Sequence, residues 1–70
     1  MNYNDHQIDV SVRAVSGGWI PDVYVTYKET GKSVLQSLPI DQIFATPNEA
    51  EKAGIGYAKK WIDDRARNIR

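Results

Sequence analysis

Apolar and polar residues alternate along the first half of the chain, which is the pattern of half-buried β-strands. The alternation covers residues 7–15 and 19–28, and it continues more weakly through residues 33–38. Glycine-containing segments at 16–18 and 28–32 separate these runs and predict two hairpin turns. The predicted core face of the first two strands consists of Ile8, Val10, Val12, Ala14, Trp19, Val23, Val25 and Tyr27. We therefore expect a three-stranded antiparallel meander.

Pro21 interrupts the pattern of the second strand. Proline has no N–H group to donate to a neighbouring strand, so it is disfavoured at positions that are paired on both sides. We therefore expect continuous pairing to start after Pro21, or a bulge to lie at this position.

A helix is predicted from Pro47 to about Asp64, because a strong start signal precedes it. Thr46 suits the capping position, Pro47 the first helical position and Glu49 the third. The predicted buried stripe, at three- and four-residue spacing, consists of Ala50, Ala53, Gly54, Tyr57, Ala58 and Trp61. The connection before the helix holds three apolar residues that we expect to close one end of the core: Ile40, Ile43 and Phe44. The predicted fold is α+β, a three-stranded antiparallel β-meander packed on one C-terminal α-helix.

Two glycines lie inside the predicted helix, and each costs about 1 kcal/mol of helix propensity relative to alanine. Gly54 belongs to the predicted buried stripe, so close packing against the sheet accounts for it. The pattern gives no role to Gly56.

The length and composition fit one small domain, residues 1–70. The chain has 41% hydrophobic residues and no cysteine, which excludes disulfides and thiolate metal sites. No apolar run reaches the ~18 residues that a membrane helix needs, and the polar start of the chain has no signal-peptide pattern. We expect a cytoplasmic protein without a membrane span. Dimerisation is a natural source of extra stability at this size.

Candidate chemistry is sparse, and we expect no catalytic residues, metal site or cofactor. His6 is the only histidine, and we place it in a mobile N-terminus as a solvated side chain. The adjacent carboxylates Asp63 and Asp64 diverge by about 100° on a helix, so they do not form a catalytic pair. Gly54-Ile55-Gly56 lies within the helix and is not a phosphate-binding loop. The sequence therefore predicts a protein that is not an enzyme.

The sheet face opposite the helix is the candidate binding surface, with Arg13, Tyr24, Thr26 and Lys28. Tyrosine and arginine are enriched at protein interfaces, although one face of an antiparallel sheet is ordinarily polar and solvated. Our leading hypothesis is a non-enzymatic interaction module that binds a protein partner or a second copy of itself. The alternative is a nucleic-acid-binding domain that uses this face or the basic end of the helix, between Lys52 and Arg70. Cations at a helix C-terminus also complement its dipole, which is the simpler explanation of that charge.

The segment Phe44-Ala45-Thr46-Pro47-Asn48-Glu49-Ala50 is followed by Trp61-Ile62-Asp63 and preceded by Gly18-Trp19 in a hairpin. This combination resembles a group of small uncharacterised bacterial proteins over residues 7–63. The resemblance implies a β-meander before a helix and a bacterial origin, and the group has no assigned activity.

The same helix start, with Gly17-Gly18-Trp19, also resembles the arm-type DNA-binding domain of tyrosine integrases. That family reads DNA with the sheet face opposite the helix, which implies a role for the four residues of the candidate surface. Asp9 and Asp22 depart from this pattern, because they bring negative charge to a face that would approach phosphates.

Overall fold

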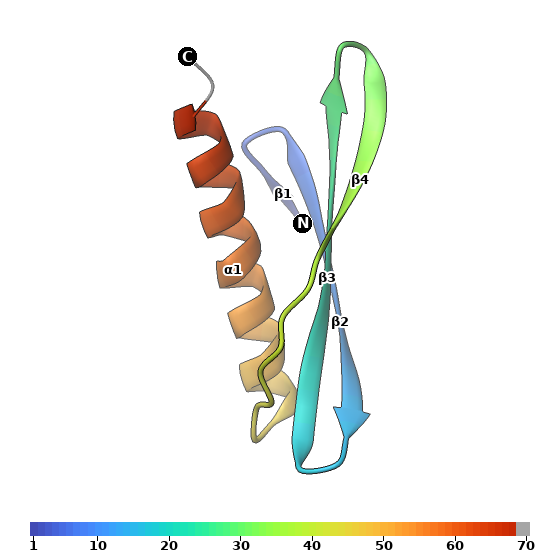
Figure 1. The fold of residues 1–70 in the computed structure, drawn as a ribbon, viewed down its shortest axis with the longest axis vertical. Coiled ribbons are helices and arrows are strands. Elements are labelled where there is room, and N and C mark those ends of the chain that lie inside the picture. Colours follow the sequence, from blue (N-terminus) through green and yellow to red (C-terminus); the bar gives the residue numbers. More distant parts are fainter. Residues whose placement is uncertain (69–70) are drawn as a thin grey trace.

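Four antiparallel strands and one helix follow one another along the chain (Figure 1). This computed structural model describes the backbone of residues 1–68 and the side chains of residues 1–67. The elements are β1 (Asn2–Tyr3), β2 (His6–Val15), β3 (Gly18–Glu29), β4 (Lys32–Leu38) and α1 (Pro47–Asn68). The strands pair in chain order, and α1 covers one face of the sheet. The predicted α+β meander with one C-terminal helix is confirmed, but the sheet has four strands rather than three.

The additional strand, β1, corrects our prediction of a mobile N-terminus. Asn4 and Asp5 have φ angles of 49° and 63°, a left-handed conformation that these two residue types tolerate well. They form a two-residue turn that brings Tyr3 opposite His6 in the ladder. The Ile8 N–H donates to the Met1 carbonyl at 2.8 Å and extends the pairing by one residue. The polar start of the chain is therefore a hairpin.

The two predicted hairpin turns are present, and each is two residues long. Residues 16–17 join β2 to β3, with Gly17 at a φ of 94°. Thr30 and Gly31 join β3 to β4 with φ angles of 51° and 81°. Positive φ at both positions matches the twist of the flanking strands. Thr30 is an unusual residue there, because β-branched side chains rarely adopt positive φ.

Pro21 lies within continuous β2–β3 pairing, opposite Val12, so the expected delay or bulge is wrong. Backbone groups of alternate residues in a strand point to the same side. The Trp19 N–H and C=O pair with Phe44, on the side away from β2, so the nitrogen of Pro21 also points away from β2. β4 ends opposite Val23 and does not reach this level. The missing N–H therefore removes no bond of the β3–β4 ladder.

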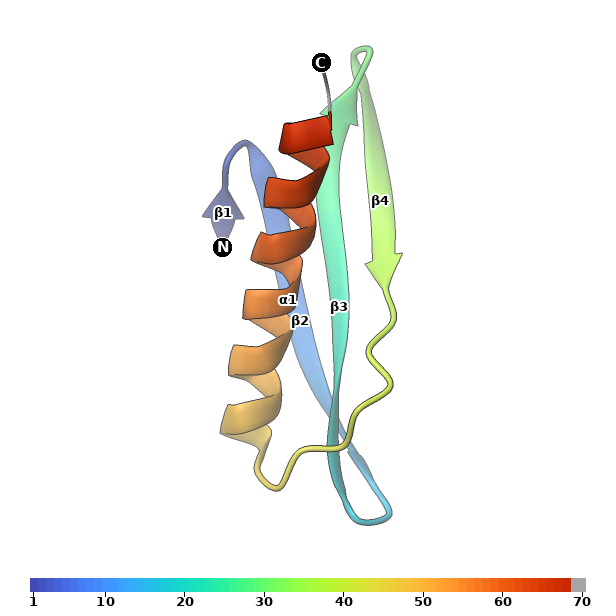
Figure 2. The ribbon, with the colours of Figure 1, turned by 60° about the vertical axis from the view of Figure 1, so that its left-hand side comes forward.

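The helix packs on β2 and β3 (Figure 2). Four residues spaced four apart face the sheet. These residues, all buried, are Ala50, Gly54, Ala58 and Ile62. They face a core that includes Ile8, Val23 and Val25. The predicted buried stripe was wrong at Tyr57, which is 47% exposed. The large buried residue of the stripe is instead Ile62, which we did not predict there and which is fully buried. The first three small residues bring the helix close to the sheet, and Ile62 fills the space beyond them.

The connection from β4 to α1 forms backbone hydrogen bonds with the sheet at one position. Trp19 and Phe44 form an isolated bridge, with N–H to O distances of 2.9 and 2.8 Å. Ile40 packs against the core, as predicted. Phe44 is half-buried, and Ile43 is 51% exposed, so Ile43 does not close the core. The helix then begins at Pro47, and the Glu49 N–H donates to the Thr46 hydroxyl at 3.1 Å. This bond confirms Thr46 as the cap.

The two helical glycines are expected to respond oppositely to alanine. A Cβ at Gly56 would meet nothing within 4 Å, so Gly56→Ala should raise the free energy of unfolding by about 1 kcal/mol. A Cβ at Gly54 would lie 3.0 Å from Val10 and Val23 methyl carbons and 3.2 Å from Pro21 Cβ. Gly54→Ala should therefore lower stability, because overpacking outweighs the gain in propensity. Urea unfolding of both variants measures the contrast, and equal stabilisation by both would contradict the close approach.

Candidate functional site

The open face of the sheet holds all four residues of the predicted binding surface. The strand register places Arg13, Tyr24, Thr26 and Lys28 on the side opposite α1. They do not form one cluster, however. Arg13 lies opposite Ile20, eight residues before Lys28, so these two cations are separated by about 26 Å along the sheet. Tyr24 and Thr26 occupy the middle of the face.

Arg13 forms an ion pair with Asp22, which lies on the same open face of the sheet. Its Nε lies 3.2 Å from Asp22 Oδ2, and its second guanidinium contact to Asp22 Oδ1 is 3.4 Å. The hydrogen bond and the negative charge of Asp22 together raise the pKa of Arg13. The pair is exposed, so it contributes little to stability. It offsets the charge of one of the two cations on the predicted binding surface.

The centre of the open face is more apolar than the predicted residues suggest. Tyr24 is 40% exposed and lies opposite Ser37, whereas Leu35 is 65% exposed and lies opposite Thr26. The two are therefore diagonal neighbours across β3 and β4, within reach of each other's long side chains. The sequence pattern did not single out Leu35, because alternation in β4 is weak and its register depends on β3.

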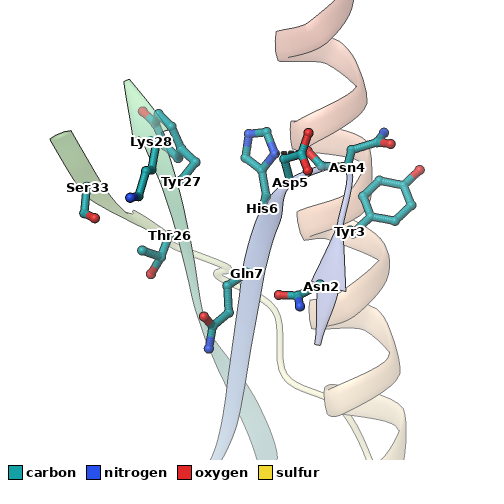
Figure 3. A pocket seen from close by; sticks show the side chains of 10 residues that line it. All are labelled: Asn2, Tyr3, Asn4, Asp5, His6, Gln7, Thr26, Tyr27, Lys28 and Ser33. Carbon is teal, nitrogen blue, oxygen red and sulfur yellow. Dashed lines mark hydrogen bonds between the residues drawn. The ribbon is translucent and has the colours of Figure 1, made fainter. Parts of the chain in front are cut away.

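A second feature is a shallow hollow of about 650 Å³ beside the N-terminal hairpin (Figure 3). Its lining residues are Asn2, Tyr3, Asn4, Asp5, His6, Gln7, Thr26, Tyr27, Lys28 and Ser33. In Figure 3 the His6 ring lies between Tyr27 and the turn at Asn4 and Asp5. The hollow exists because β3 continues beyond the start of β2. It is wide open to solvent, unlike the enclosed sites that bind small ligands.

His6 has a structural role in this hollow. Its Nδ1 lies 2.6 Å from the Asn4 carbonyl, and since a carbonyl only accepts, Nδ1 carries the proton. Its ring packs on Tyr27 with a centroid distance of 5.3 Å. The covered Nε2 has no hydrogen-bond partner within residues 1–67. The same part of the chain contains no group of three or more side chains that could hold a metal ion. A sequence cue to the position of His6 was the Asn4-Asp5 dipeptide, which favours a turn.

Side chains from both ends of the chain meet next to this hollow. The Tyr3 hydroxyl donates to the two Asp63 carboxylate oxygens at 2.9 and 3.1 Å. This hydrogen bond, with partial burial and the negative charge of Asp63, raises the pKa of Tyr3. Lys59 lies over the Tyr3 ring at 5.4 Å from its centroid. These contacts hold β1 against one flank of α1.

The raised pKa of Tyr3 predicts a contribution to stability that is lost at high pH. The unfolded phenol loses its proton near pH 10, whereas the folded phenol keeps its proton to higher pH. The contribution is therefore complete below pH 10 and falls as the pH rises through the folded pKa. Thermal unfolding of the wild type and Tyr3→Phe from pH 7 to pH 12 measures it. The variant should be less stable at pH 7, and the difference should shrink above pH 10; a constant difference would contradict this assignment.

Two arginines in the last turns of the helix contact other groups of the protein. Arg65 lies over the Tyr27 ring at 4.1 Å and within 3.4 Å of a Glu29 carboxylate oxygen. Arg67 lies 3.8 Å from Asp64 on the same helix. Arg70, which we included in the basic end, lies outside the described residues. The cations Arg65 and Arg67 therefore have partners that compete with phosphate.

Comparison with known proteins identifies a family but no activity. The chain matches, over residues 1–70, the family described as a domain of unknown function (DUF6566). No curated protein and no solved structure matches the chain. In the described part of the chain, α1 is not apolar enough over a sufficient length to cross a membrane.

Proposed function

The chain belongs to the DUF6566 family, a domain of unknown function. We propose that it is a non-enzymatic module that binds a protein through the open face of its sheet. The observation that carries the proposal is the exposed apolar area of Tyr24 and Leu35 at the centre of that face. An aromatic and an aliphatic side chain surrounded by polar residues is a usual arrangement at the centre of a protein interface.

The geometry of the fold supports this assignment. The only helix of the described chain covers the other face, so the open face has no partner within the domain. Thr26, Ser37 and Asp9 surround Tyr24 through the register and supply hydrogen-bonding groups at the margin. His6, the side chain most suited to acid–base chemistry, packs on Tyr27 and donates to a backbone carbonyl. A binding role therefore accounts for more of the surface than a catalytic one.

Photocrosslinking in living cells tests the proposal, because it captures a partner whose identity is not yet established. A photoreactive phenylalanine analogue replaces Tyr24, and the matched control carries it at Gly56, which is exposed on the solvent side of α1. We expect discrete protein adducts at position 24 that are absent at position 56. The adducts should weaken when Leu35→Ser is added, because it removes the neighbouring apolar area. Adducts equal at both positions, or none at position 24, would refute the proposal.

Nucleic-acid binding is the second candidate, and the specific observation in its favour is Lys28, which follows Tyr24 and Thr26 in one row along the open face. The Arg13–Asp22 pair and the partners of Arg65 reduce the charge free for phosphate. We expect no mobility shift of single- or double-stranded DNA or RNA at about 20 mM salt and micromolar protein. A shift that disappears in Lys28→Ala but persists in the matched control Lys60→Ala would favour this candidate over protein binding.

A further inference from the structure

The outer edge of β4 is an open strand edge. β4 is the last strand of the sheet, and α1 packs on β2 and β3 rather than over β4 (Figure 2). An unpaired edge presents backbone N–H and C=O groups to any strand that approaches. The opposite edge of the sheet is partly covered, because β1 pairs with the start of β2.

The direction of the free backbone groups follows from the observed hydrogen bonds. Since Trp19 points its groups to the β4 side, Val23, Val25 and Tyr27 do the same. Their partners on β4 are Leu38, Gln36 and Val34, which therefore point inward. The residues between them, Ser33, Leu35 and Ser37, direct both N–H and C=O outward. The same alternation on β2 predicts that Ile8 points outward, in agreement with its bonds to Met1.

Most of this edge lacks the features that usually prevent edge-to-edge pairing. Lys32, at the start of β4, is the one charged residue of the strand; residues 33–38 contain no charge and no proline, and the pairing with β3 is continuous without a bulge. Pro39 follows directly and would point its nitrogen outward, so it limits the free edge to the three outward residues. A short edge that is uncharged over residues 33–38 is suited to one partner strand of matching length.

The edge is complementary to itself about Leu35. In an antiparallel pairing centred there, Leu35 faces Leu35 of a second copy, and Ser33 faces Ser37. Each of the three outward residues would donate one hydrogen bond and accept one, so no group on the edge remains unpaired. We propose that two copies of this chain pair through β4, antiparallel and centred on Leu35, to form one continuous sheet.

The exposed flank of α1 is consistent with this arrangement. The two-fold axis of such a pair is perpendicular to the sheet, so both helices lie on the same face. Trp61 contacts Tyr27 of β3 at a centroid distance of 6.0 Å, whereas Lys59 contacts Tyr3 on the other flank. Tyr57, one turn before Trp61, therefore lies on the flank toward β4. Pairing would place the exposed Tyr57 of each copy beside the groove between the two helices.

This inference goes beyond the proposed function, because it uses the outward backbone groups of β4 and not the side chains of the open face. Leu35 contributes to both, so the two are distinguished by sedimentation of the wild type and by photocrosslinking at position 24, neither of which alters Leu35. Because the natural chain has no cysteine, a single introduced cysteine reports on one position without interference.

Disulfide crosslinking of the full chain tests the pairing. Facing residues in a hydrogen-bonded antiparallel pair have Cα atoms about 5.5 Å apart, within the range that a disulfide spans. Leu35→Cys should form a disulfide dimer rapidly under mild oxidation. Tyr24→Cys is the matched control on the same face, because the two β3 strands of the pair are three strand spacings, about 14 Å, apart. It should remain uncrosslinked.

Mixed crosslinking checks the register. Ser33→Cys and Ser37→Cys chains should crosslink with each other when mixed, and each should crosslink poorly alone. Sedimentation of the wild type should show a dimer, and Leu35→Glu should give a monomer with an unchanged circular dichroism spectrum, because like charges would face each other.

A wild type that stays monomeric at millimolar concentration would overturn the self-pairing, as would crosslinking of Leu35→Cys no faster than that of Tyr24→Cys. Photocrosslinked adducts of other proteins at position 24, together with a monomeric wild type, would uphold the proposed function while refuting this inference.

Discussion

Ile62→Ala is expected to lower the free energy of unfolding by about 3 kcal/mol, within the range of about 2–5 kcal/mol for large-to-small core changes. Ile62 is fully buried and belongs to the cluster with Ile8, Val23 and Val25. The other buried residues on the helix stripe are alanine and glycine, so no larger neighbour on α1 can fill the cavity. A domain of this size has a total stability of about 4–10 kcal/mol, so the midpoint of thermal unfolding should fall by roughly 15 °C.

Tyr57→Ala is the matched control for Ile62→Ala. Tyr57 is on the same helix and is a larger residue, but it is 47% exposed. We expect a loss below about 1 kcal/mol, as is usual for surface positions. Differential scanning calorimetry or urea unfolding measures both variants. A loss at Tyr57 equal to that at Ile62 would mean that the helix is rotated relative to the arrangement described.

Gly18→Ala should destabilise the protein by about 3 kcal/mol or more, because two costs coincide. Gly18 has a φ of 154°, and a Cβ there would lie 2.3 Å from the Phe44 carbonyl oxygen and 2.7 Å from an Ile43 side-chain carbon. The first contact is with backbone, which cannot move without disrupting the Trp19–Phe44 bridge. Strained backbone alone costs about 1–3 kcal/mol, and overpacking adds a similar amount.

Gly17→Ala separates these two costs. Gly17 also has a positive φ, 94°, but a Cβ there would meet nothing within 4 Å. We expect a loss of about 1–2 kcal/mol from the backbone conformation alone. Urea unfolding of both variants gives the difference, which reports the contact with Phe44. Equal losses would show that the connection before α1 is not held against β3.

The sequence correctly predicted the three longer strands and the helix start, because each depends on residues that are close together in the chain. The alternation of residues 7–15 and 19–28 depends only on which face of a strand is buried. The helix start depends on the cap of Thr46 and the fixed φ of Pro47, both within one turn. These predictions are confirmed because no distant contact opposes them.

The incorrect predictions concern features that depend on contacts between residues far apart in the sequence. β1 is too short to show a pattern, and it is held by pairing with β2 and by Asp63 near the end of the helix. The choice between Tyr57 and Ile62 depends on the rotation of α1, which is set by the close approach at Gly54. Pro21 is accommodated because β4 ends before reaching its level. None of these facts can be obtained from a window of neighbouring residues.

The sequence predicted which residues share the candidate surface, but not which of them contact one another. Alternation assigned Arg13, Tyr24, Thr26 and Lys28 to the same side of the sheet. It did not reveal that Arg13 pairs with Asp22, because that contact depends on the β2–β3 register. Leu35 was missed for the same reason, since its position beside Thr26 follows from the β3–β4 register.

The contact between Tyr3 and Asp63 has a consequence for the order of folding. It joins residues 60 positions apart, whereas the meander is built from hairpins between neighbouring strands. Contacts between residues far apart in the sequence form late, because closing the long loop costs entropy before the contact can stabilise the structure. The N-terminal hairpin should therefore dock after the transition state. Stopped-flow kinetics of Tyr3→Phe should then show faster unfolding with nearly unchanged refolding, and a slowed refolding rate would place this closure early.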